Sequence, residues 1–269
     1  MKKLLFILIV LVAVGVGMSF EVGKFAEKKI NYKVVKVNGH IQFVKTGHDM
    51  KMGDVYIAGT SLKFITASSR AAVMNKSVRF IIQSNSKGKV KVLPATSNVT
   101  SRAGALINLI DLQNHFSGRY LMFDNESLQI GKEAFPMDEE HFFYVKYDYK
   151  DESIAKRLNF KDNFLKINKE ELFKVDGKSI AIEEKEMTLY YRDDEEKKSY
   201  KINTFVPVFP DLKILKEEIT MLLSGSEDLT LDHKLGQVTS YLNEFYGKPQ
   251  KDNLISWLGQ EFGLKFEQV

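Results

Sequence analysis

The side chains most capable of chemistry in this sequence are its histidines, because imidazole binds metal ions and transfers protons near neutral pH. The five histidines are His40, His48, His115, His141 and His233. No two of them are two or four residues apart, so none share one face of a strand or helix at close spacing. The clusters closest to a metal-ligand set are His48-Asp49 and Asp138-Glu139-Glu140-His141, but adjacent residues of an extended chain point to opposite faces. The histidines therefore predict no metal site and no cofactor.

Acidic side chains could act in pairs on glycosidic bonds, one as general acid and the other as base or nucleophile. The densest acidic run is Asp193, Asp194, Glu195 and Glu196. Charge runs of this kind are usually solvated tips of turns, whereas a catalytic acid needs burial to raise its pKa. The sequence also contains no Gly-x-Ser-x-Gly elbow and no phosphate-binding loop. We therefore expect a protein that is not an enzyme; a glycan-directed envelope hydrolase using a carboxylate pair is the alternative.

A tyrosine-rich stretch is the strongest candidate for a contact surface. Side chains alternate between the two faces of a strand, so one face would carry Phe143, Val145, Tyr147 and Tyr149. The opposite face would then carry tyrosine and charge together, a mixture that suits contact with a protein or a glycan. The candidate interaction residues are Tyr144, Lys146 and Asp148, together with Trp257 near the carboxyl end of the chain.

Residues 32–99 are expected to form a small all-β module, because short β-type runs alternate there with Gly, Asn and Ser. Asn38-Gly39 lies between the runs 33–37 and 41–45. It predicts a two-residue hairpin turn, since Asn-Gly supplies the positive φ angles of a type I′ turn. Further strands are predicted at residues 54–57, 62–66, 71–74, 78–83 and 90–93, with Lys87-Gly88 turning the last pair.

The rest of the chain is expected to change from helix to sheet and back to helix. Apolar residues at helical spacing predict a linking helix over residues 100–118, capped by Thr100 or Ser101. Residues 119–209 are expected to form a second, antiparallel β module, with turns at Asp176-Gly177 and across 192–198. Its predicted strands are 119–123, 142–149, 154–160, 164–167, 187–192 and 200–206. Residues 210–269 carry three apolar stripes that predict amphipathic helices, packed on a sheet or presenting a partner-binding face.

The amino-terminal segment predicts export. Lys2 and Lys3 precede an apolar run from Leu4 to Met18, the pattern of a secretory signal peptide over residues 1–19. Left uncleaved, residues 4–20 would instead serve as an anchor that associates the protein with the inner membrane. Either interpretation places the remaining chain in the periplasm or cell envelope.

Composition excludes several functional classes. The net charge is +4, from 39 basic and 35 acidic residues. Without Lys2 and Lys3 the balance is 37 to 35, and no cluster of Lys and Arg suggests nucleic-acid binding. The chain has no cysteine, which excludes disulfides, thiol catalysis, cysteine–zinc sites and a lipoprotein anchor.

A series of short motifs between Val34 and Gln83 follows a recognisable order. The segments are Val35–Ile41 around Asn38-Gly39, Met52–Val55 with Gly53-Asp54, Ala58–Leu62 and the Ser/Thr-rich Thr66–Val73. This order resembles the periplasmic domain of the FecR family, which implies a β-rich, exported interaction module. Regulators of that family hold a sigma factor through a cytoplasmic tail, whereas only Lys2 and Lys3 precede the apolar run here. Sigma-factor control is therefore not carried over, although a membrane-anchored FecR-like signalling regulator is a further alternative.

These patterns together predict a β-rich α+β fold. We expect a small all-β N-terminal module, a linking helix, a second antiparallel β module and C-terminal amphipathic helices. The expected function is that of an exported, non-catalytic binding or assembly protein of the bacterial cell envelope, acting through sheet and helix docking surfaces. Its partner would be an envelope protein or a glycan, and not a nucleic acid.

Overall fold

The computed structural model of the chain is β-rich, with several sheets and helices. It describes residues 30–76, 78–85, 90–94, 104–224, 226 and 228–266. Outside these ranges lie the predicted leader at residues 1–19, the Lys87-Gly88 turn and the caps Thr100 and Ser101. In the part that is described, no helix is long and apolar enough to cross a membrane. Asn31–Val269 forms one compact unit.

The first part of that unit contains two small antiparallel sheets, with strand orders β3-β1-β5-β6-β7 and β2-β4. Their strands are β1 (Asn31–Asn38), β2 (Ile41–Phe43), β3 (Val55–Ile57), β4 (Leu62–Phe64), β5 (Arg70–Asn75), β6 (Val78–Ser84) and β7 (Val90–Pro94). The five strands predicted after the Asn-Gly turn are confirmed, because β3 to β7 lie within a residue or two of the expected ranges. Val34, Ile41, Val73 and Ile82 belong to the apolar core between the strands.

The hairpin predicted at Asn38-Gly39 is wrong. Gly39 has the expected positive φ, +77°, but β1 pairs with β3 and β5, whereas β2 pairs with β4 in another sheet. The chain turns a corner there: the His40 N–H donates to Ser69 Oγ at 3.0 Å. A Cβ at position 39 would lie 2.7 Å from the same oxygen. Close packing against Ser69 requires the glycine, and both edges of β1 are occupied by other strands.

The linking helix is shorter than predicted. Among the described residues of 100–118, the helical ones are α2 (Leu109–His115). The side chain of Asn108 caps it by accepting from the Asp111 N–H at 2.9 Å. Before this cap, Leu106 forms a parallel bridge with Ile130, so the chain is extended where the pattern predicted helix. Leu112 of α2 joins the core of the following sheets.

The second β-rich part is built around a six-stranded sheet of order β11-β10-β16-β17-β8-β18, beside a three-stranded sheet, β12-β13-β9, and the hairpin β14-β15. The strands are β8 (Gly118–Leu121), β9 (Asn125–Gln129), β10 (His141–Tyr149), β11 (Glu152–Arg157), β12 (Asn159–Lys161), β13 (Phe164–Asn168), β14 (Lys174–Val175), β15 (Lys178–Ser179), β16 (Met187–Asp193), β17 (Lys198–Val208) and β18 (Lys248–Pro249), with α3 (Lys169–Leu172) between β13 and β14. The predicted turns at Asp176-Gly177 and between β16 and β17 are present. The core includes Phe116, Tyr120, Phe143, Leu165 and Phe205.

The expectation of a wholly antiparallel second module is wrong at one edge of the large sheet. There β8 pairs in parallel with β17 and with β18. The C-terminal region, residues 210–269, was expected to be helical, but it also contains the strand β18, which follows α5. Gly247 permits this pairing: a Cβ at that position would lie 2.6 Å from the carbonyl oxygen of Arg119. The single strand predicted over 154–160 is divided between β11 and β12, which lie in different sheets.

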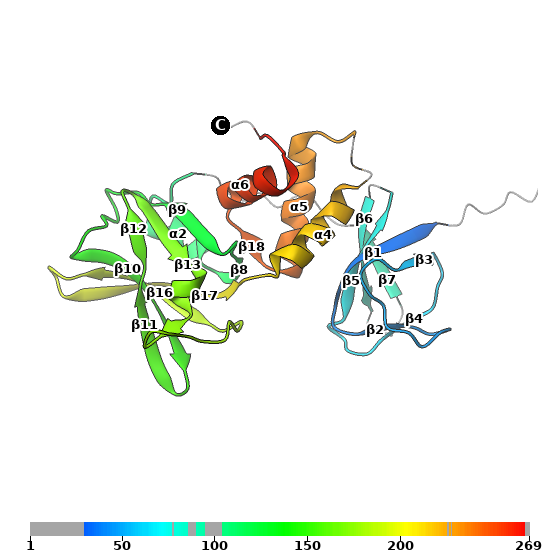
Figure 1. Ribbon diagram of the computed structural model, residues 1–269, viewed down its shortest axis with the longest axis horizontal. Helices are drawn as coiled ribbons and strands as arrows, with labels where there is room; N and C mark the ends of the chain where they lie inside the picture. Colours follow the sequence, from blue (N-terminus) through cyan, green and yellow to red (C-terminus); the bar gives the residue numbers. More distant parts are fainter. Residues whose placement is uncertain are drawn as a thin grey trace, which may run out of the picture. The chain divides into compact units, whose positions relative to one another are not determined.

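Three helices follow from the predicted apolar stripes: α4 (Leu212–Leu223), α5 (Leu231–Phe245) and α6 (Lys251–Phe262). Asp211, Thr230 and Gln250 cap their amino ends. Their stripes pack in one cluster with residues of β1 and β5 and of β8 and β17. Figure 1 shows α4 against β1 and α5 beside β18, in agreement with these contacts. The helices therefore bury their apolar faces on sheets, the first of the two predicted arrangements.

Candidate functional site

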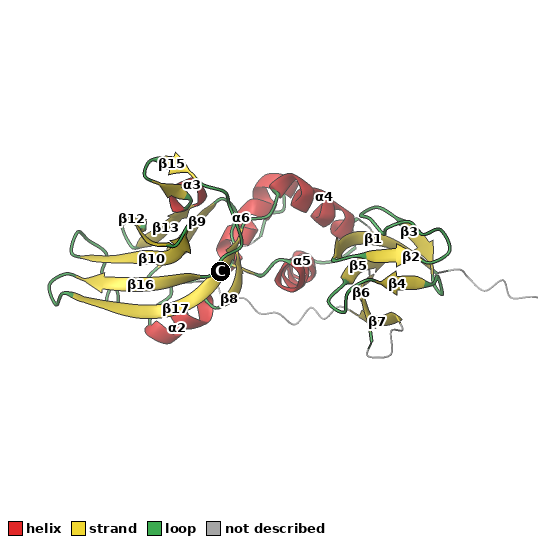
Figure 2. Cartoon of the chain, turned by 90° about the horizontal axis from the view of Figure 1, so that it is seen from below, coloured by secondary structure: helices red, strands yellow, loops and turns green. Residues whose placement is uncertain are grey.

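The outward side of the six-stranded sheet combines tyrosines with cations. The predicted alternation of β10 is confirmed, since Phe143, Val145 and Tyr147 are buried while Lys146 and Asp148 are exposed. Figure 2 shows β10, β16 and β17 side by side. Their register places Tyr144 between Arg157 and Tyr190 on the neighbouring strands. We call this outward surface the cation–tyrosine face; it consists of Phe142, Tyr144, Lys146, Asp148, Ala155, Arg157, Tyr190, Arg192, Ser199 and Lys201.

Ring and cation contacts hold the centre of the face in place. Tyr144 and Tyr190 stack with ring centroids 5.1 Å apart and planes at 12°. Lys146 Nζ lies 5.9 Å and 5.6 Å from the centroids of these two rings. The Arg157 guanidinium lies 4.1 Å from the ring centroid of Phe142. Exposed contacts of this kind contribute about 0.5–1 kcal/mol each, so their main effect is to orient the side chains.

A shallow hollow of about 480 Å³ opens on this face. It is lined by Phe142, Tyr144, Lys146, Ala155, Arg157, Arg192 and Ser199. Three of these side chains are cationic and none is acidic. Carboxylates contact the arginines of the face, Glu139 at 3.3 Å from Arg157 and Asp194 at 2.5 Å from Arg192. In the described part of the chain, no carboxylate pairs with Lys146, so the hollow favours a negatively charged ligand.

Trp257 does not belong to an interaction surface, contrary to the prediction. Its side chain is 7 % exposed and stacks on Phe123 with ring centroids 5.2 Å apart. The apolar stripe of α6 turns it toward the core together with Leu254 and Leu258. Asp148 does lie on the cation–tyrosine face, beyond the hollow, where its backbone oxygen accepts from Lys185 Nζ at 3.4 Å.

Sequence reasoning missed the partners that complete the face, Arg157, Tyr190 and Arg192. A signal for β16 was present, because Met187, Leu189 and Tyr191 alternate with Tyr190 and Arg192. The order of strands in the sheet was not readable, however, so nothing in the sequence placed Tyr190 opposite Tyr144.

The acidic and histidine clusters of the sequence serve local structure. Asp138 accepts from the Glu140 and His141 N–H groups at 2.9 Å and 2.7 Å and contacts the His141 ring at 3.0 Å. That side-chain hydrogen bond raises the pKa of His141. Within the residues the structure describes, no group of three or more His, Asp or Glu side chains is arranged to hold a metal ion.

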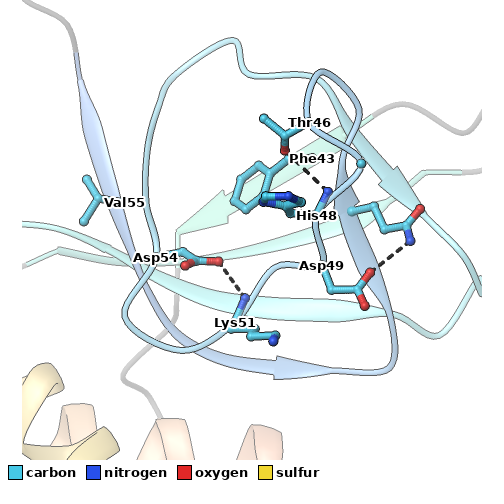
Figure 3. Close-up of a pocket in the computed structure, with 9 residues that line it drawn as sticks. Phe43, Thr46, His48, Asp49, Lys51, Asp54 and Val55 are labelled. Carbon is cyan, nitrogen blue, oxygen red and sulfur yellow. Dashed lines mark hydrogen bonds between the residues drawn. The ribbon is translucent and has the colours of Figure 1, made fainter.

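His48 and Asp49 line another open hollow, of about 680 Å³. Asp49 accepts from Gln42 Nε2 at 2.9 Å and lies 2.5 Å from His40 Nε2; these hydrogen bonds lower its pKa. Figure 3 shows Asp49 and, separately from it, Asp54, which accepts from the Lys51 N–H at 2.8 Å. The carboxylates therefore support separate turns.

The acidic run 193–196 lies at the β16–β17 turn, as predicted. Asp193 accepts from the Glu196 N–H at 2.8 Å, and Glu196 accepts from Tyr200 Oη at 2.7 Å and Lys198 Nζ at 3.0 Å. Asp194 is paired with Arg192, and Glu195 is exposed. These acids stabilise a hairpin tip and its neighbouring cations.

Glu126 of β9 is a buried carboxyl group that the sequence analysis did not identify, because no strand was predicted there. It is 2 % exposed; it accepts from the Phe123 N–H at 2.8 Å and from the Asn253 amide, and lies 3.5 Å from Tyr120 Oη. Burial raises its pKa to about 8. His115 Nε2 lies 2.8 Å from the same tyrosine oxygen, and burial lowers the pKa of His115 to about 3. The network joins α2, β8, β9 and α6 and is closed within the core.

Glu218 is the second buried carboxylate, 2 % exposed on α4. Tyr241 Oη donates to it at 2.7 Å, Tyr246 Oη at 2.5 Å and Lys36 Nζ of β1 at 2.9 Å. Its position on the apolar stripe, three residues after Leu215, was a signal for this burial. The cluster fastens β1 to α4 and α5.

His233 stands at the amino end of α5, where its Nδ1 lies 2.8 Å from Thr230 Oγ1. It takes part in the cap of this helix.

No protein-family model matches the chain, and a search of the curated proteins finds no relative. The FecR resemblance of residues 34–83 therefore stays a prediction. The geometry of the cation–tyrosine face is the basis for a functional interpretation.

Proposed function

We propose that the protein is an exported, non-catalytic binding or assembly protein of the bacterial cell envelope, and that the cation–tyrosine face is its contact surface. The observation that carries this proposal is the Tyr144–Tyr190 stack with Lys146 over both rings, on the solvent side of a sheet whose other side is core. Tyrosine and arginine are enriched in protein interfaces. The leader pattern of residues 1–19 supports export.

Pre-organisation supports the same function. Binding costs free energy when side chains must be immobilised at the interface. Here the rings are already ordered by one another and by the pleat of the sheet, and a tyrosine has few rotatable bonds to restrict. A partner would therefore meet a surface that changes little on contact.

The absence of cysteine from the chain provides a direct test. In the full-length protein, Ser199→Cys places a single thiol at the rim of the hollow, and Lys213→Cys places one on the exposed side of α4. Each variant is coupled to a photoactivatable cross-linker and illuminated in isolated cell envelopes. We expect a discrete adduct from position 199 that is lost when Tyr144→Ala and Tyr190→Ala are added. Equal products from both thiols, or none from position 199, would contradict the proposal.

A glycan hydrolase remains the second candidate, because another hollow of about 700 Å³ is lined by Asp124, Glu170 and Glu171. Asp124 is paired there with Lys169 Nζ at 2.9 Å. Release of reducing sugar from purified peptidoglycan, abolished by Glu171→Gln, would support this candidate over the binding function. A membrane-anchored FecR-like regulator is separable from both by intact mass, since removal of residues 1–19 would remove the anchor.

A further inference from the structure

We infer that the cation–tyrosine face binds an acidic segment of a partner protein, whose carboxylates enter the hollow lined by Lys146, Arg157 and Arg192. This inference rests on the proposed function and specifies the chemistry of the partner. Its basis is charge complementarity: three cations line the hollow, no acid does, and no carboxylate in the described structure pairs with Lys146.

The arginines of the face already bind carboxylates of this chain. Arg157 holds Glu139, whose side chain is 93 % exposed, and Arg192 holds Asp194, which is 44 % exposed. Exposed ion pairs of this kind contribute little to folding, so a partner carboxylate can replace them without destabilising the sheet. Guanidinium groups bind carboxylates through paired donors, which gives direction as well as attraction.

The aromatic side chains favour a protein over a glycan. A sugar ring needs an open aromatic face on which to lay its C–H groups. Tyr144 and Tyr190 cover each other at 5.1 Å, and Arg157 covers Phe142 at 4.1 Å. One face of each ring is therefore already covered by a neighbour, whereas the cationic groups and the tyrosine hydroxyls are donors suited to acidic side chains.

The test measures binding of a fluorescein-labelled deca-glutamate peptide to the full chain by fluorescence anisotropy at low and physiological salt. The face variant carries Lys146→Gln, Arg157→Gln and Arg192→Gln. The matched control carries Lys63→Gln, Lys132→Gln and Lys213→Gln, three exposed cations outside the face with the same loss of charge. We expect the face variant to raise the Kd at least about tenfold and the control less than about twofold, with wild-type binding weakened by salt. Circular dichroism of each variant checks that the sheet is intact.

Three results would overturn the inference: no binding of the peptide, equal weakening in both variants, or tighter face-dependent binding of polygalacturonate than of deca-glutamate. None of these removes the proposed function by itself. If cross-linking at position 199 still captures an envelope component, the face remains a contact surface and only the acidic-peptide assignment fails.

Discussion

The buried carboxyl group of Glu126 should make the free energy of unfolding fall as the pH rises. Its carboxyl group is 2 % exposed in the core, where burial raises the pKa from 4.5 to about 8. Between these two values the folded chain keeps a proton on Glu126, whereas the unfolded chain has lost it. The folded state therefore binds more protons, and the stability it gains in this way is fully present below pH 4.5 and lost as the pH passes through about 8.

The size of this change in stability follows from the difference between the pKa values of Glu126 in the folded and the unfolded chain. One unit corresponds to about 1.4 kcal/mol, so the whole window corresponds to about 5 kcal/mol. Part of this pH range lies below pH 5, and local entry of water reduces the desolvation of the carboxyl group. We therefore expect the free energy of unfolding of the wild type to fall by about 2–4 kcal/mol between pH 5 and pH 8, relative to that of Glu126→Gln. The glutamine keeps the shape and an oxygen for the Phe123 N–H, but does not titrate.

The measurement is urea unfolding of the full chain at several pH values, followed by the fluorescence of Trp257, the single tryptophan. This residue lies on α6, the helix that supplies Asn253 to the Glu126 network. Glu152→Gln, an exposed acid on β11, is the matched control and should keep the wild-type slope.

The reasoning is refuted if Glu126→Gln and wild type show parallel dependence on pH across this window. Such a result would mean that Glu126 is ionised in the folded protein, held by the Asn253 amide and the Phe123 N–H. A slope removed equally by Glu152→Gln would show that overall charge, and not burial, causes it.

The other predictions concern the remaining buried contacts. Glu218→Leu should lower the free energy of unfolding by about 3 kcal/mol, because it leaves two tyrosine hydroxyls and a lysine without their carboxylate. In the same urea titration the control Lys216→Gln, which breaks only an exposed ion pair, should lower it by less than about 1 kcal/mol. Gly39→Ala should be less stable than Gly53→Ala by at least about 1 kcal/mol, since both sites have positive φ but only the first meets a neighbouring residue; equal thermal midpoints would argue against the corner packing. The wild-type protein should lose stability as the pH falls from 6.5 to about 3, because the pKa of His115 is about 3 in the folded chain and 6.5 in the unfolded chain. His115→Gln should not show this loss. Unfolding curves at pH 4 and pH 7 that match those of the wild type would exclude this prediction.

Much of the secondary structure could be predicted because its causes are local. The strands β3 to β7 follow from short β-type runs between turn residues, and Asp176-Gly177 turns its hairpin through positive φ at both positions, +49° and +75°. The stripes of α4, α5 and α6 have helical periodicity and polar caps. Each of these signals lies within a single element and the residues next to it.

The errors arose where a distant partner decided the outcome. Asn38-Gly39 has hairpin chemistry, but the two edges of β1 are taken by β3 and β5. Leu106 fits a helical pattern, yet it pairs with Ile130. β8 pairs in parallel with β17 and β18, two strands that come much later in the chain, and no local pattern indicates such a pairing.

Local sequence is enough to predict which residues alternate and which face of each element is apolar, because the pleat and the helical repeat are properties of the local backbone. It therefore separated Tyr144 and Lys146 from the buried side of β10. Strand order and register, which bring Tyr190, Arg157 and Arg192 beside them, are visible only in the folded chain, as is the packing that buries Trp257 of α6. Pairing between strands depends on contacts between residues far apart in the chain, and these exist only once the whole sheet is assembled.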